Sequence, residues 1–323
     1  MAIFTNNTFA PVVEQAEDIL VDKYPHIMPT VESAYEIATE GYGDIYKLMS
    51  GLYIADLKVE EAVREGAEAE PLIEASIKEY KDKVIAKFKE IGEKIAAWFK
   101  KIWENLKIRF GSSKDFVVKY KDAIIAKSKT VKDFKPKHHE FNTDVKGVIG
   151  GYMSTIVDFA KADAEKNKAN DKFVADMVKK VNSKATTIGE MKSAVQEELI
   201  GKEVETAISA SAVAAMVKYC ENISVALATM EDLKNKNAKA IDTIIKDINN
   251  SGKTVELINA KTRCYNAAMS AVQALNAISV SVVNKINSEY VSILRALMLA
   301  KVESAGEEMM TESSIFSSAM NLI

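Results

Sequence analysis

The sequence predicts an all-α protein, a multi-helix bundle with a long antiparallel helical hairpin in its C-terminal part. The chain has 323 residues but only five prolines and thirteen glycines, and no proline follows Pro136. The residues that most strongly break helices are therefore rare. Apolar residues also recur at helical spacing over long stretches, and no stretch alternates with the two-residue period of a strand over a useful length.

The first segment, residues 1–71, is acidic. It carries 4 basic and 14 acidic side chains, a net charge of −10. We expect a helix over residues 11–24 and a longer one over residues 30–64, because Pro25 and Pro29 interrupt the pattern between them.

The second segment, residues 72–140, is basic and contains an amphipathic helix predicted over residues 72–110. Residues 72–139 carry 18 basic and 9 acidic side chains. One face of the helix is apolar and includes both tryptophans of the chain, whereas lysines and glutamates occupy the opposite face. We expect Gly111, Ser112 and Ser113 to end this helix and to cap another over residues 114–131.

Two interpretations of the amphipathic helix follow from this pattern. Its apolar face is either a core face that other helices cover, or a surface that engages a membrane or a partner protein, as a basic helix with aromatic residues can. Under the second interpretation, the candidate partner-contact face consists of Trp98, Phe99, Lys100, Lys101, Trp103 and Lys107.

The third segment, residues 141–323, is predicted to hold further helices and the hairpin. We expect shorter helices over residues 142–164, 170–182 and 187–200. The last of these opens with Thr187 followed three residues later by Glu190, which is the spacing of a capping box.

The hairpin is predicted over about residues 203–303. Residues 203–249 and 254–303 both show apolar or small residues close to heptad spacing, and a polar turn lies between them. The stretch 264–284 has no charged residue but contains several Asn, Gln and Ser residues, so we expect a buried helix and no transmembrane segment.

Motifs that would carry chemistry are weak. Gly252, Lys253 and Thr254 lack the earlier glycine and the preceding strand of a phosphate-binding loop. His138 and His139 are adjacent, so their side chains would diverge in a helix, and a solvated loop is the simpler interpretation.

The two cysteines, Cys220 and Cys264, fall on opposite hairpin arms. They are offset by about 18 residues, or roughly 27 Å along a helix, whereas a disulfide needs Cα atoms within about 7 Å. We expect two buried free thiols, no enzyme activity, no cofactor and no metal site.

One region of the chain resembles a known protein family. It covers residues 50–125 and the tyrosines just before them. The matching elements are Tyr42, Tyr46 and Tyr53, then Ala62–Glu68, Leu72–Glu74, Trp98–Trp103 and Lys114–Tyr120. They resemble a group of virion-associated structural proteins of large tailed bacteriophages, which share a Glu-Gly segment, an FFKKxW-like helix and a (K/D)FxxKY segment. The resemblance implies a structural role in the particle, inside or on the head, and carries over no catalytic residues.

The expected function is therefore helix-mediated assembly of a phage virion. The partners would be other virion proteins and further copies of the chain. The protein would be made in the host cytoplasm, since residues 1–15 show no signal-peptide pattern. Two alternatives remain open: a helical pore-forming or membrane-active protein, and a packaged protein that coats DNA through the lysines between residues 78 and 137.

Overall fold

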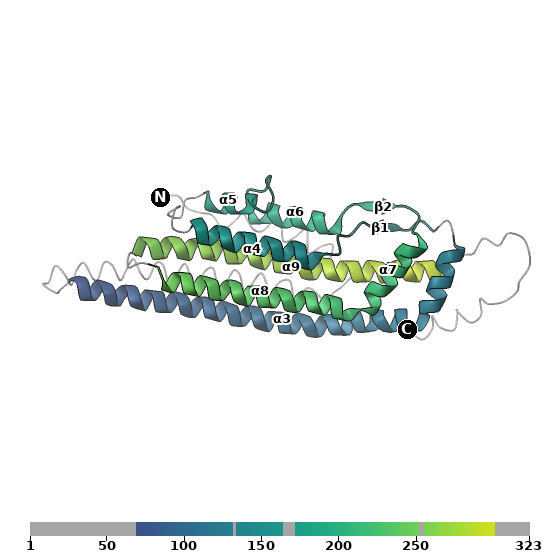
Figure 1. The fold of residues 1–323 in the computed structure, drawn as a ribbon, viewed down its shortest axis with the longest axis horizontal. Helices are drawn as coiled ribbons and strands as arrows, with labels where there is room; N and C mark the ends of the chain where they lie inside the picture. The colour runs from purple at the N-terminus through teal and green to yellow at the C-terminus, as the bar shows by residue number, and fades with distance from the viewer. Residues whose placement is uncertain (1–68, 132–133, 164–171, 252–254, 301–323) are drawn as a thin grey trace, which may run out of the picture.

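A computed structural model describes residues 69–131, 134–163, 172–251 and 255–300, and shows an elongated all-α bundle (Figure 1). The helices expected over residues 11–24 and 30–64 lie outside the described residues. The elements are α3 (Ala69–Thr130), β1 (Lys137–His139), α4 (Val145–Asp163), α5 (Phe173–Lys179), α6 (Ile188–Ile200), β2 (Glu203–Glu205), α7 (Ala210–Glu221), α8 (Ile223–Asn249) and α9 (Val255–Leu299).

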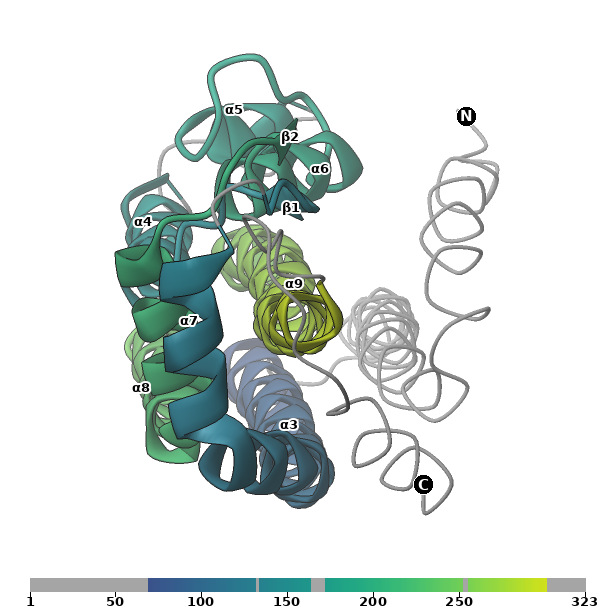
Figure 2. The same ribbon diagram turned by 90° about the vertical axis from the view of Figure 1, so that its right-hand side faces the viewer.

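Helix α9 is the centre of the bundle. It packs against each of the other described helices, with α3 and α8 along one side and α4, α5 and α6 along another (Figures 1 and 2). Within its charge-free stretch, residues 264–284, sixteen of the 21 residues are buried and none is exposed. The expectation of a buried helix there is confirmed, and so is the antiparallel pairing of α8 with α9.

The sequence predicts that the helix ends at Gly111, but α3 continues to Thr130. It bends instead, and its C-terminal part turns away from the long axis (Figure 1). The hydroxyls of Ser112 and Ser113 donate to the carbonyls of Ile108 and Arg109, at 3.4 and 3.2 Å. Such bonds to the preceding turn bend helices without ending them.

The first arm of the predicted hairpin is also different from the expectation. Residues 203–249 form a short strand and two helices, because the helix breaks at Asn222 (φ −100°, ψ 68°) between α7 and α8. The break lets α7 pack alongside the bent end of α3 (Figure 2). Apolar spacing continues through residue 222, so periodicity alone gave no sign of the break.

Two short strands, which were not predicted from the sequence, join the connection after α3 to the connection after α6. They pair antiparallel with Lys137 opposite Glu205. Gly201 precedes β2 with φ 69°, and a Cβ there would lie 2.3 Å from the carbonyl oxygen of Glu140. Only glycine fits both the left-handed backbone and this close approach.

The shorter helices agree with their predicted ranges. At the start of α6 the Thr187 hydroxyl accepts from the Glu190 backbone N–H at 3.1 Å. The Glu190 carboxylate accepts from the backbone N–H and hydroxyl of Thr186, one residue earlier than in the expected capping box.

The buried side chains form two cores. The main core runs along the bundle and includes residues of α3, α4, α5, α6, α8 and α9. The end core is smaller and is formed by Val117 and Ile124 of α3 with residues of α7 and the last turns of α9. Each core contains residues from both segment 72–140 and segment 141–323. The two segments therefore share their cores.

Candidate functional site

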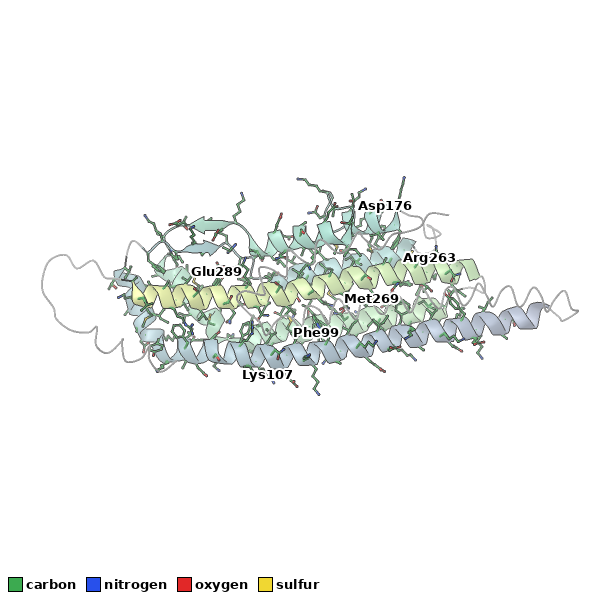
Figure 3. All side chains as sticks on the ribbon, turned by 180° about the vertical axis from the view of Figure 1, so that it is seen from behind. Phe99, Lys107, Asp176, Arg263, Met269 and Glu289 are labelled. Carbon is green, nitrogen blue, oxygen red and sulfur yellow. The ribbon has the colours of Figure 1, made fainter. Side chains whose placement is uncertain are left out.

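In the structure, the predicted partner-contact face consists of two parts, buried aromatic side chains and exposed lysines. Trp98 and Phe99 are 4% and 2% exposed and pack edge to face in the main core, with their ring centroids 4.9 Å apart. Figure 3 shows Phe99 directed into the bundle and Lys107 directed away from it. The assignment of Trp98 and Phe99 to a free surface is therefore wrong, and the core-helix interpretation holds for this face.

The outward side of the same stretch of α3 remains available for a partner. Lys100, Lys101, Lys107 and Lys114 are exposed, and we call these four residues the α3 basic patch. Among the described residues none of the four forms an ion pair. Lys107 lies over the half-buried ring of Trp103, with its Nζ 5.5 Å from the centroid. Beside the patch, Ile108 is 72% exposed.

The first half of α3 has a different charge arrangement. There Lys83 pairs with Glu79 at 2.6 Å, and Glu90 pairs with both Lys87 and Lys94, at 2.7 and 3.3 Å. These contacts hold the pKa of the Glu79 and Glu90 carboxyls below their usual range. Local pairing neutralises three of the six lysines in this half. At the α3 basic patch, by contrast, none of the four lysines forms an ion pair among the described residues.

A second polar cluster joins β1 to α9 and was not found from the sequence. Glu289 accepts from the backbone N–H of His139 at 2.5 Å and lies 2.8 Å from its Nδ1. The Nζ of Lys285 lies 3.4 Å from Nε2 of the same ring. These contacts fit a ring that donates from Nδ1 and accepts at Nε2. His139 and Glu289 are 150 residues apart, so no local pattern could reveal the pair.

The contacts of His139 suit a structural role, which is to hold β1 against α9, better than a catalytic one. Among the described residues, no hydroxyl or thiol bonds to Nε2 of His139, so the geometry offers no nucleophile for it to activate. Rings also connect the cluster to α7: Phe141 lies 5.6 Å from His139 and 6.0 Å from Tyr290, which lies 5.4 Å from Tyr219. This chain of rings binds β1, α9 and α7 together.

Inside the main core, polar side chains connect α8 to α9. Asn237 and Asn276 exchange hydrogen bonds at 3.1 and 2.9 Å, and Gln273 donates to Asn237 at 3.4 Å. Nearer the hairpin turn, the buried Lys261 pairs with Asp247 at 3.0 Å, and Tyr265 donates to the same carboxylate at 2.5 Å. Such buried partners fix the register of two helices.

The remaining candidates for chemistry are inert in this structure. Cys220 and Cys264 are buried and form no disulfide, as expected. Burial raises the pKa of the Cys220 thiol to about 12, so it remains protonated and is a poor nucleophile. Within the described ranges no group of three or more His, Cys, Asp or Glu side chains is placed to hold a metal ion.

By length and composition, one described helical segment, Leu257–Leu299 of α9, could cross a membrane, with a mean hydropathy of 1.3. Its most apolar window is 78% buried inside the bundle, which is the position of a core helix.

Comparisons of the chain with protein-family models, with curated proteins and with solved structures found no match.

Proposed function

We propose that the protein is a non-enzymatic structural component of a tailed-phage virion, head-associated or internal, which acts through helix-mediated assembly. The observation that carries the proposal is the α3 basic patch. Its four lysines form no ion pair among the described residues, and they and the exposed Ile108 lie on a helix whose other face is fixed in the main core. A rigid helix that presents unsatisfied charge beside an apolar side chain suits a protein–protein contact.

The family resemblance supports the same proposal. The Trp98–Trp103 motif places its lysines outward and most of its aromatic side chains inward, so one short stretch supplies both core packing and a contact surface. Under this proposal the motif's aromatic residues specify the fold and its lysines meet other virion proteins.

Fractionation of infected cells tests the proposal. Particles are purified on a density gradient, and the protein is followed with a specific antibody. We expect it to sediment with particles and to remain after a wash that removes loosely bound protein. Recovery of the protein only as free monomer in the supernatant would reject a virion role.

Helix α9 gives a membrane-active protein as a second candidate function. Its apolar segment is long enough to cross a bilayer. Insertion would carry the polar residues Gln273 and Asn276 into the hydrocarbon, which costs free energy. Release of an encapsulated dye from liposomes distinguishes the two functions, because a virion scaffold should release none.

Packaging of DNA is a weaker candidate. Three of the six lysines in the first half of α3, Lys83, Lys87 and Lys94, are paired with glutamates and are less available to phosphates. A DNA-coating role predicts binding that weakens steeply as salt is raised.

A further inference from the structure

The α3 basic patch has the charge and shape to bind an acidic segment. At residues 100–114 of α3, the exposed positions hold four lysines and a single acid, Glu104. Positions 100, 104 and 107 follow one another at steps of four and three residues, so Lys100, Glu104 and Lys107 lie on one outward face, with Ile108 beside them. The face combines positive charge with one large apolar side chain.

Within this chain, residues 1–71 have the complementary composition. They carry a net charge of −10, and they include apolar and aromatic residues as well as acids. The patch residues are exposed in the single chain, so a segment from another molecule can reach them.

We propose that the α3 basic patch of one copy binds the acidic segment, residues 1–71, of a second copy. The contact joins copies head to tail, because a different surface is used on each side, and such a contact builds rings or filaments. This inference rests on the proposed function, since it names the contact through which assembly would proceed.

A charge-swap experiment on the full chain tests the contact. The patch variant is Lys100→Glu/Lys101→Glu/Lys107→Glu, and the acidic-segment variant is Glu60→Lys/Glu61→Lys/Glu65→Lys. The matched control, Lys78→Glu/Lys89→Glu/Lys129→Glu, makes the same change in charge at exposed positions of α3 outside the patch. Circular dichroism establishes that each variant is folded, and light scattering gives its average mass.

At about 0.1 M salt, where charges act over roughly 10 Å, we expect the parent and the control to have the mass of a dimer or larger assembly. The patch variant and the acidic-segment variant should each be monomeric, and an equal mixture of the two should regain the assembly. At about 1 M salt all samples should dissociate, because the screening length falls to about 3 Å.

Three outcomes would overturn the inference: a monomeric parent at low salt, a patch variant that assembles like the parent, or a mixture that stays monomeric. Sedimentation of the parent with phage particles is measured separately. If the parent is found in particles but the charge-swapped variants do not behave as expected, only the contact proposed here is rejected. If the charge-swapped variants behave as expected but the parent is absent from particles, the virion role is rejected and the proposed contact is retained.

Discussion

Asn287 of α9 donates a hydrogen bond from Nδ2 to Oγ of Ser113, at 2.8 Å, where α3 bends. Both side chains are buried, and Oδ1 of Asn287 has no hydrogen-bond partner in the described part of the chain. The bond lies between the main core, which Phe110 of α3 joins, and the end core, which Val117 joins. It therefore connects the central helix to the point at which α3 leaves one core for the other.

Ser113→Ala should lower the free energy of unfolding by about 1–3 kcal/mol, because it leaves a second polar atom of Asn287 buried without a partner. Urea denaturation followed by circular dichroism measures the change. The control is Ser112→Ala, since Ser112 is exposed and bonds only within its own helix; it should change the free energy by less than about 0.5 kcal/mol. Equal effects of the two substitutions would show that the bond to Asn287 contributes nothing.

Asn276→Ala should also destabilise the protein by about 1–3 kcal/mol, because Asn237 would lose the partner with which it exchanges two hydrogen bonds in the core. The matched control is Asn235→Ala, an exposed asparagine on the same helix as Asn237. Chemical denaturation of both variants checks this, and a stability loss as large at Asn235 would contradict the core network.

The corrected position of the aromatic residues has its own test. Trp98→Ala or Phe99→Ala should lower the free energy of unfolding by about 3–5 kcal/mol, as loss of a large buried side chain does. Lys100→Ala and Lys101→Ala should have effects below about 0.5 kcal/mol, since these lysines are exposed. If the aromatic substitutions left stability unchanged, the face would be a surface after all.

Alkaline pH should weaken the fold through Tyr80. Burial raises the pKa of Tyr80 from its ordinary 10.0 to about 12, and its hydroxyl donates to Asn259 at 2.8 Å. A raised folded-state pKa gives stability that is complete below pH 10 and is lost as pH rises through about 12. Tyr80→Phe has no proton to lose, so its unfolding free energy should fall less steeply between pH 10 and 12.

Denaturation of parent and Tyr80→Phe at a series of pH values compares these slopes. The difference at pH 8 measures the loss of the hydroxyl and its hydrogen bonds, including the one to Asn259, because Tyr80 is protonated there. Parallel curves from pH 8 to 12 would show that Tyr80 ionises as readily in the folded state as in the unfolded chain.

Both cysteines should be protected from thiol reagents in the folded protein. Cys220 and Cys264 are buried, and the raised pKa of Cys220 leaves little thiolate at pH 8. We expect two thiols to react with a chromogenic disulfide reagent after denaturation and none to react quickly before it. Fast labelling of the native protein would indicate that α7 opens readily from the end core.

The fold class and most helix positions were predictable because they depend on local signals. Thr187 and its neighbours start α6, and the apolar face of residues 72–110 corresponds to the buried face of α3. The break at Asn222 was not predictable, because the apolar positions on either side keep one register and no proline or glycine marks it. Strands of three residues are also too short for their alternation to be recognised.

The candidate site was predicted in part. Sequence spacing placed Lys100, Lys101 and Lys107 opposite the aromatic face, and the structure finds them exposed. It could not decide whether the aromatic face was covered, since that depends on α8 and α9, which lie more than a hundred residues further along the chain. The pairing of His139 with Glu289 depends on the same distant packing.

The central position of α9 has a consequence for how the protein is made. α9 is the last of the described helices to leave the ribosome, yet every other described helix packs against it. Neither core can form until the residues of α9 have been synthesised. Apolar faces such as that of α3 therefore remain exposed to solvent during translation. Folding should therefore be largely post-translational, and chains that stall before residue 255 should be substrates for chaperones and proteases.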